Sequence, residues 1–312
     1  MKKLLIIAGL LAMASTSAAA APIIDLNQGS DNLVMLKNHR LLPIGDYKAV
    51  TVISTDYDAG HSTSFWLRQE LPSSRIHDLP WKEQNMEAID LYTTPEQSEC
   101  VVLILTENDT KRFRDYIVDY IAARTSLLTL VVNTPRPIDM ETISQQAKSI
   151  IITDISNPDS LGKVLARTIS GSVNPSGRLP YTIAKDKAQG KDYQYYDENK
   201  IDVLYPMGYG VGFSSFAYSK ACVDNSKGKT TVKVEVTNEN IRTGSEVVQI
   251  YAESTSLPNV TTLVGASRVT VTAAAPVTAV IDVDMSDMPN GSYKLWVGSS
   301  SRDLRIALPY TK

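Results

Sequence analysis

The stretch Asn174-Pro-Ser-Gly-Arg-Leu-Pro180 stands between two parts of the chain that differ in sequence pattern. Pro175 fixes φ, Gly177 permits the positive φ of a tight turn, and Pro180 keeps the next residues extended. We therefore expect a rigid exit from a helix here, which Arg178 is suited to anchor through an ion pair. The stretch has the composition of a structural turn rather than of a catalytic centre.

Before this stretch, short apolar runs alternate with helical patterns. The runs are rich in Val, Ile and Leu without polar alternation, as strands covered on both faces require, and they predict a largely parallel α/β sheet. They lie at Ala49–Ile53, Ala88–Tyr92, Val101–Leu105, Leu127–Val132 and Ser149–Thr153. One-face apolar spacing predicts helices over Thr110–Arg124 and Asp159–Ser170. Pro158 suits the first turn of the second helix, because that turn leaves its N–H groups unpaired.

After about Ser219 the apolar residues recur with period two, which predicts an antiparallel β-sandwich. The expected strands are Thr231–Thr237, Glu246–Tyr251, Ser267–Thr272, Val277–Val283 and Tyr293–Gly298. Asn290-Gly291 is the dipeptide that favours a tight hairpin. Between the two patterns, residues 185–218 contain a polar, tyrosine-rich run that predicts a connecting loop; its tyrosines either pin the linker to a domain or stack on a sugar.

The N-terminus has the layout of a cleaved secretory signal peptide over residues 1–21: Lys2 and Lys3, an apolar stretch, and an alanine-rich end. No later apolar run approaches the roughly 20 residues of a membrane span, so the sequence predicts a soluble periplasmic or secreted protein. The net charge is -3, with acids and bases interspersed, which argues against nucleic acid as a partner.

Cysteine and histidine are scarce. The two cysteines, Cys100 and Cys222, lie far apart in the sequence. In an oxidising compartment they either pair or remain two separate thiols, and spacing does not decide between these. With three histidines in the chain and no ligand set near either cysteine, no metal site is expected, and no cofactor is indicated.

Further stretches follow one another in the order seen in a known family. They are Leu33–Asn38 with Leu41–Ile44, Glu99–Leu105, Asn133–Pro137, Val173–Thr182, Tyr205–Phe216 and Gly244–Tyr251. Together they resemble the C-terminal portion of the family 3 glycoside hydrolases, over nearly the whole mature chain. Members of that family combine a nucleophile-bearing (β/α)8 barrel, an α/β sandwich domain and a fibronectin type III-like domain.

The resemblance covers the last two of these domains. It implies a largely parallel α/β sandwich domain over residues 22–184, a linker over 185–218 and a fibronectin III/immunoglobulin-like β-sandwich over 219–312. A barrel needs roughly 200 residues or more, which the chain does not provide, so no residue here inherits the role of nucleophile.

The resemblance also suggests site residues. The acid/base carboxylate of many members comes from a loop of the α/β domain, and Glu107 stands in that place, just past a strand end; the alternative is a surface or helix-capping carboxylate. Asp109 follows it in the same loop and is a candidate for substrate binding. His61 and Ser62 stand where members often have a substrate-touching loop, although His61 fits an exposed position equally well.

Four functions remain open. The first is an exported, stand-alone β-glucosidase-like C-terminal part without catalysis of its own, acting as accessory or partner subunit of a separate barrel-bearing glycosidase. The second is a carbohydrate- or envelope-binding protein on a relic scaffold, and the third is a folded, inactive remnant. The fourth is an active O-glycosyl hydrolase with relocated carboxylates, which needs two acids about 5 Å apart; the candidates are Asp56, Asp58, Glu107 and Asp109.

Overall fold

The computed structural model describes residues 32–45, 49–80, 100–185, 190–226, 229–257 and 259–312. The predicted signal peptide and the apolar run Ala88–Tyr92 lie outside these residues. The described residues form two compact units, one over 32–177 and one over 178–184 with 190–312. We call them the α/β unit and the sandwich unit, and the division falls inside the stretch 174–180.

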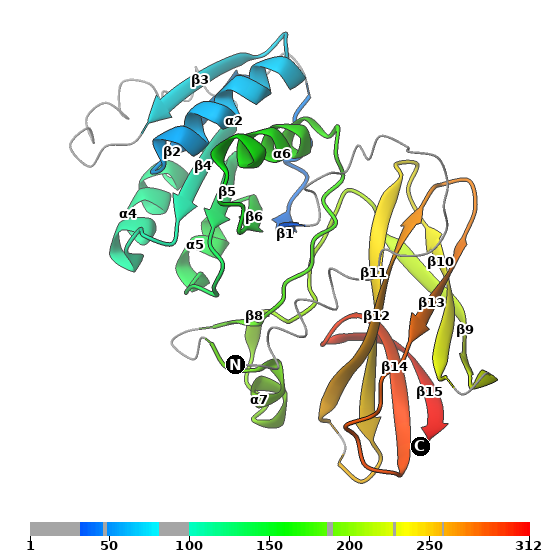
Figure 1. The fold of residues 1–312 in the computed structure, drawn as a ribbon. Coiled ribbons are helices and arrows are strands. Elements are labelled where there is room, and N and C mark those ends of the chain that lie inside the picture. The colour runs from blue at the N-terminus through cyan, green and yellow to red at the C-terminus, as the bar shows by residue number, and fades with distance from the viewer. Residues whose placement is uncertain (1–31, 46–48, 81–99, 186–189, 227–228, 258) are drawn as a thin grey trace. The chain divides into compact units, whose positions relative to one another are not determined.

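A six-stranded sheet is the centre of the α/β unit (Figure 1). Its strand order is β1-β6-β5-β4-β2-β3; β1 is antiparallel to β6, and the other neighbours are parallel. The strands are β1 (Leu33–Asn38), β2 (Ala49–Ser54), β3 (Arg75–Pro80), β4 (Cys100–Thr106), β5 (Leu128–Asn133) and β6 (Ser149–Thr153). The largely parallel sheet expected from the continuous apolar runs is confirmed, and it gains β1 and β3, which were not among the predicted strands.

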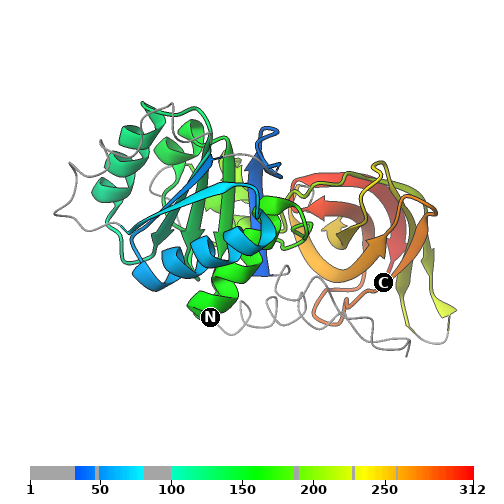
Figure 2. The same cartoon turned by 90° about the horizontal axis from the view of Figure 1, so that it is seen from above.

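Helices cover both faces of this sheet (Figure 2). α2 (Tyr57–Glu70) and α6 (Pro158–Ser170) pack together on one face, and α4 (Lys111–Ala122) and α5 (Glu141–Gln146) lie on the other. Side chains cap three of the helix N-termini by accepting main-chain hydrogen bonds, as N-cap residues do; these are Asp56, Thr110 and Asn157. The two helices expected from the sequence are therefore confirmed as α4 and α6.

The core of the sandwich unit lies between two antiparallel sheets, one of three strands and one of four. One has the order β13-β10-β9 and the other β12-β11-β14-β15. The strands are β9 (Phe216–Asp224), β10 (Thr231–Asn238), β11 (Gly244–Ser254), β12 (Thr261–Val271), β13 (Val277–Asp282), β14 (Ser292–Ser300) and β15 (Asp303–Thr311). Apolar residues from both sheets form one core, and β10 shows the alternating burial that its period-two sequence predicts.

The hairpin expected at Asn290-Gly291 is wrong. β13 pairs with β10, whereas β14 pairs with β11 and β15, so the chain crosses from one sheet to the other at this dipeptide. The Gly291 N–H donates to the Lys312 carbonyl, and the Lys312 N–H donates back to Gly291. Asn290-Gly291 thus lies in a crossover connection next to the end of β15, and neither residue has the positive φ of a tight hairpin turn.

The region expected to be a linker is instead a layer of the sandwich unit. It holds α7 (Tyr193–Glu198) and β8 (Val203–Tyr205), and β8 pairs with β7 (Ile183–Ala184), which lies just before the region. We call residues 178–184 and 190–212 the cover segment. The hydroxyl of Tyr193 in α7 donates to the Thr261 carbonyl at 3.2 Å and accepts from the Leu263 N–H at 2.8 Å, so α7 is fixed to β12.

Strand β11 is buried on both faces because the cover segment lies on its outer face. Val248, Ile250 and Ala252 belong to the sandwich core, but the alternate residues Gln249 and Tyr251 are also almost fully buried. Tyr251 packs with Met207 and Tyr193 of the cover segment. The strand expected at Glu246–Tyr251 is present, but its burial does not alternate with the period of two that the sequence pattern predicted, because both of its faces are covered.

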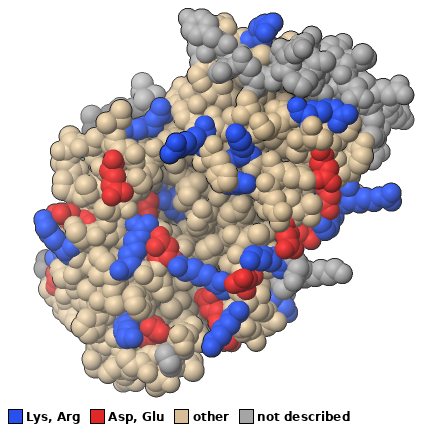
Figure 3. All heavy atoms as spheres, turned by 180° about the vertical axis from the view of Figure 1, so that it is seen from behind, with Lys and Arg blue, Asp and Glu red and all other residues tan. Residues whose placement is uncertain are grey.

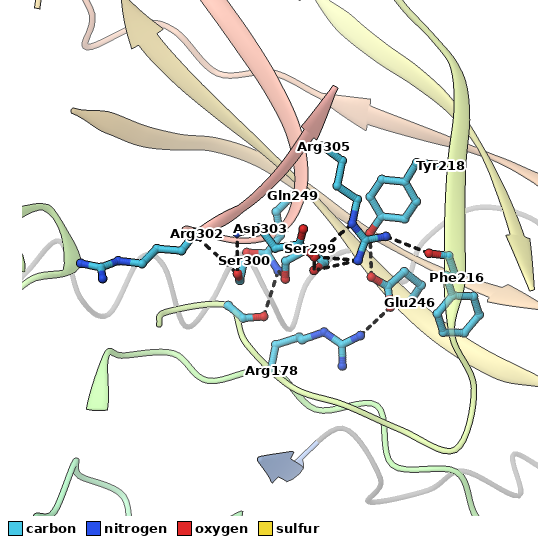
Figure 4. A network of polar contacts seen from close by, with 11 residues as sticks. Arg178, Phe216, Tyr218, Glu246, Gln249, Ser299, Ser300, Arg302, Asp303 and Arg305 are labelled. Atoms are coloured by element: carbon cyan, nitrogen blue, oxygen red, sulfur yellow. Dashed lines mark hydrogen bonds and ion pairs between the residues drawn. The ribbon is translucent and has the colours of Figure 1, made fainter. Parts of the chain in front are cut away.

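A polar network joins the cover segment to β11 and β15 (Figure 4). Arg178 donates to Glu246 at 2.6 Å, and the Tyr218 hydroxyl donates to the other carboxylate oxygen at 2.6 Å. Arg305 stacks over the Tyr218 ring and donates to Asp303 at 2.7 Å. The ion pair expected for Arg178 is present, although its partner lies 68 residues further along the chain.

The stretches that carry the family resemblance therefore interlock. The N–H of Leu179 donates to the Tyr209 carbonyl at 2.9 Å, and the N–H of Gly208 donates to the Leu179 carbonyl at 2.8 Å. Gln249 donates to the Gly208 carbonyl at 3.1 Å. Gly208 has φ of +81°, and an added Cβ would lie 2.9 Å from Gln249 Cδ. These residues serve the architecture of the sandwich unit.

Candidate functional site at the carboxyl edge of the parallel sheet

The carboxyl ends of the parallel strands in the α/β unit gather the predicted site residues. Open α/β sheets place their ligand-binding loops at this edge. Glu107 and Asp109 follow β4 there, and the β5–α5 connection adds Arg136. α2 begins three residues after β2 and carries His61 and Ser62.

Glu107 lies on the surface and is paired with Arg136. The guanidinium donates to Glu107 Oε2 at 2.7 Å, with the side chain of Arg136 77% exposed and that of Glu107 36% exposed. The hydrogen bond to Glu107 raises the pKa of Arg136. Arg136, in the turn Asn133–Pro137, was not among the predicted site residues, because its pairing with Glu107 depends on β4 and β5 being neighbours in the sheet.

Asp109 turns inward. Its Oδ2 accepts hydrogen bonds from the Thr106 N–H and from the Thr55 hydroxyl, each at 2.7 Å. The Thr106 hydroxyl adds a third at 3.3 Å. These bonds connect the ends of the neighbouring strands β4 and β2, so Asp109 holds the edge together.

His61 lies inside helix α2, where the resemblance had suggested a loop. Its Nδ1 is 3.1 Å from Asp78 Oδ2, the ring is parallel to Tyr57 at 5.9 Å between centroids, and both rings are exposed. Sequence reasoning missed Asp78 because it did not detect β3. Tyr57 is the first residue of α2, and its i, i+4 spacing to His61 predicts that the two share a helix face.

Ser62 points to the neighbouring helix. An added Cβ at Gly162 of α6 would lie 2.6 Å from the main-chain carbon of Ser62, so the two helices approach closely at this point. The Ser62 hydroxyl is 3.5 Å from Asp159 Oδ1. The structure thus places His61 and Ser62 on different sides of α2, although they are adjacent in sequence.

The remaining titratable groups suggest no metal centre. Asp56 caps α2 through the Ala59 N–H at 3.1 Å, which accounts for one of the scattered carboxylates. Within the described ranges, no group of three or more His, Cys, Asp or Glu is arranged to hold a metal ion. On the face drawn in Figure 3, basic side chains lie next to acidic ones over much of the surface.

Both cysteines are free thiols. Cys100 is buried in β4, and burial raises the pKa of its thiol to about 12. Cys222 lies exposed in β9. No helix in the part of the chain that the structure describes is long and apolar enough to cross a membrane.

Comparison with known proteins agrees with this architecture. The model for the glycosyl hydrolase family 3 C-terminal domain matches residues 33–213, more than half of the chain. The protein therefore belongs to this family. The chain is 27% identical over 248 residues to the probable beta-glucosidase L of Aspergillus terreus, which covers 62% of this chain and 34% of that protein.

Solved structures of two beta-glucosidases show the same fold. The beta-D-glucoside glucohydrolase of Trichoderma reesei aligns with a TM-score of 0.75 and 19% identity, covering 92% of this chain and 55% of that one. The GH3 beta-glucosidase of Bifidobacterium adolescentis aligns with a TM-score of 0.75 and 21% identity, covering 92% of this chain and 52% of that one. The chain thus spans about a third of the first curated relative and about half of these solved chains.

Proposed function

We propose that this chain supplies the non-barrel part of a β-glucosidase-like glycosidase and acts as its accessory or partner subunit. In this role it is exported, periplasmic or secreted, and does not catalyse alone. The observation that carries the proposal is Glu107, an exposed carboxylate at the carboxyl edge of the parallel sheet, in a chain of a family whose named relatives are beta-glucosidases.

The proposed chemistry divides between two polypeptides. Retaining hydrolysis needs one carboxylate to attack the anomeric carbon and a second, about 5 Å away, to protonate the leaving oxygen. A separate barrel supplies the attacking group, and Glu107 supplies the proton. The donor bond from Arg136 to Oε2 fixes the orientation of the Glu107 side chain while the other oxygen stays available.

His61 and Asp78 extend the proposed site along the same sheet edge. The hydrogen bond between them sets which ring nitrogen of His61 remains for a sugar hydroxyl. Ser62 and Asp109, both predicted to touch substrate, have contacts within the unit, and in the proposal they support the site without binding the sugar.

The test is hydrolysis of chromogenic β-glucosides, β-xylosides and N-acetyl-β-glucosaminides by the mature chain, alone and mixed with a separately expressed family 3 barrel. The proposal predicts no hydrolysis alone and hydrolysis on mixing. Glu107→Gln should lower the mixed rate by about a hundredfold or more, the usual share of general acid catalysis. Asp115→Asn, at a half-buried carboxylate of α4, is the matched control and should leave the rate unchanged.

Two other outcomes decide against a subunit role. Hydrolysis by the chain alone that disappears in Glu107→Gln indicates an enzyme with relocated carboxylates. No hydrolysis in either arm favours the second candidate, a carbohydrate-binding protein. The specific observation for that candidate is the exposed, parallel pair of Tyr57 and His61 rings, a surface on which a sugar can stack.

A further inference from the structure

The turn between β4 and α4 is fixed on both sides of Glu107. On the amino side, the N–H of Thr106 donates to Asp109 Oδ2 at 2.7 Å, and the hydroxyl of Thr106 donates to the same oxygen at 3.3 Å. On the carboxyl side, the N–H of Asp109 donates to the Thr106 carbonyl at 3.3 Å. The side chain of Asp109 therefore closes the short turn that contains Glu107.

The same carboxylate reaches a second strand. The hydroxyl of Thr55, directly after β2, donates to Asp109 Oδ2 at 2.7 Å. The N–H of Thr55 donates to the Ile104 carbonyl of β4 at 3.1 Å. Because β2 and β4 are neighbours in the sheet, these bonds attach the turn to a rigid element rather than to another loop.

The main chain of Asp109 has a further support. The guanidinium of Arg114 donates to the Asp109 carbonyl, and Arg114 is 6% exposed despite its charge. A charged group this deeply buried needs its hydrogen bonds, so its bond to the turn is costly to lose. Side chain and main chain of Asp109 are thus held from two different elements, β2 and α4.

These contacts leave Asp109 poorly suited to bind a ligand. Its Oδ2 has three donors from within the α/β unit, whereas Glu107, two residues earlier, has a side chain open to solvent. We infer that Asp109 is a positioning residue, which together with Thr55 and Arg114 holds the β4–α4 turn so that Glu107 is presented at the sheet edge. The inference rests on the proposed function for the role of Glu107 and on geometry alone for the turn.

The first arm of the test needs no ligand. Hydrogen–deuterium exchange of the full chain reports the Thr106 amide, which donates to Asp109. Asp109→Ala and Thr55→Val should each raise its exchange rate by about tenfold or more. Asp109→Asn and Thr55→Ser keep an oxygen at each position and should restore most of the protection. Glu198→Gln, at an exposed carboxylate of α7, should change nothing.

The second arm measures hydrolysis of 4-nitrophenyl β-D-glucoside by the chain mixed with a separate barrel. A shift of about 1 Å in a catalytic group can lower a rate by about a hundredfold, so Asp109→Ala should reduce kcat strongly with little change in KM. In the Glu107→Gln background, Asp109→Ala should lower kcat hardly any further, because Asp109 acts through Glu107. Equal losses in both backgrounds would instead make Asp109 a direct ligand contact and overturn the inference.

The two arms separate the inference from the function it rests on. If the mixed system is inactive for every variant, the proposed function fails, and the exchange arm still decides whether Asp109 holds the turn. If Thr106 exchange is the same in Asp109→Ala, Thr55→Val and the unchanged chain, the positioning role is wrong whatever the activity.

Discussion

Two arginine–glutamate pairs of almost equal length lie in very different surroundings. Arg136 and Glu107 are 2.7 Å apart at the edge of the α/β unit, with side chains 77% and 36% exposed. Arg178 and Glu246 are 2.6 Å apart in the sandwich unit, with side chains 5% and 4% exposed. Exposed pairs contribute little to stability, whereas breaking a buried pair leaves an uncompensated charge. The first pair is thus free to serve a ligand, and the second serves the fold.

The largest effect is expected from breaking the buried pair. Glu246→Ala removes the acceptor of both Arg178 and the Tyr218 hydroxyl, and it should lower the free energy of unfolding by about 3–5 kcal/mol. Urea unfolding of the full chain measures this. Glu235→Ala, at a half-buried carboxylate paired with the exposed Lys220, is the control and should have a far smaller effect. Similar losses of unfolding free energy in both variants would mean that burial does not determine how much an ion pair contributes to stability.

A smaller loss is expected where the cover segment approaches β11. Gly208→Ala places a Cβ 2.9 Å from Gln249 Cδ at a residue with φ of +81°, so both crowding and backbone strain oppose it. The free energy of unfolding should fall by about 1–3 kcal/mol. Gly190→Ala has a similar positive φ but nothing within 4 Å, and it isolates the contribution of strain. Equal losses in the two variants would remove the crowding argument.

The sandwich unit should also respond to acid through Asp303. Its hydrogen bond from Arg305 lowers the pKa of Asp303 below the ordinary value of 3.8. A lowered folded-state pKa gives stability that is present above about 3.8 and is lost as the pH falls through the folded value. The unfolding temperature should therefore fall less steeply between neutral pH and acid in Asp303→Asn than in the unchanged chain. Identical acid profiles for the variant and the unchanged chain would contradict this linkage.

The smallest effect on stability is expected at the exposed pair. Glu107→Gln should shift the unfolding temperature by less than about 2 °C, because the pair is solvated and its loss buries no charge. Scanning calorimetry measures this shift. Asp109→Ala at the same sheet edge provides the contrast, since it removes the inward acceptor of Thr106 and Thr55. A large shift in Glu107→Gln would show that the exposed pair is structural after all.

Most of the two-unit fold was predictable from the sequence, because strand burial leaves a direct trace in residue pattern. The two-sided strands β4 and β6 read as continuous apolar runs, and β10 reads as a period-two strand. β3 was not predicted, because its sequence, Arg75–Pro80, mixes polar and charged residues with apolar ones. It lies at the edge of the sheet, where burial does not impose an apolar pattern.

The cover segment was misread for a related reason. Its polar, tyrosine-rich sequence resembles a linker, yet the tyrosines bury their rings and keep their hydroxyls hydrogen-bonded, as Tyr193 does on β12. The candidate site was predictable in part. The position of Glu107 directly after a strand indicated it as a site residue. Its ion pair with Arg136 and the inward hydrogen bonds of Asp109 depend on which strands are neighbours in the sheet. Residue spacing does not contain that information.

The most direct measurement compares Glu107→Gln with Glu246→Gln in the same two assays, hydrolysis of 4-nitrophenyl β-D-glucoside on mixing with a separate family 3 barrel and thermal unfolding of the chain. We expect Glu107→Gln to lower the rate by about a hundredfold at an unchanged unfolding temperature. Glu246→Gln should lower the unfolding temperature, and below that temperature the rate of hydrolysis on mixing should be unchanged. A Glu107→Gln chain that retains full activity, or one that is destabilised as much as Glu246→Gln, would contradict the division between a site carboxylate and a fold carboxylate.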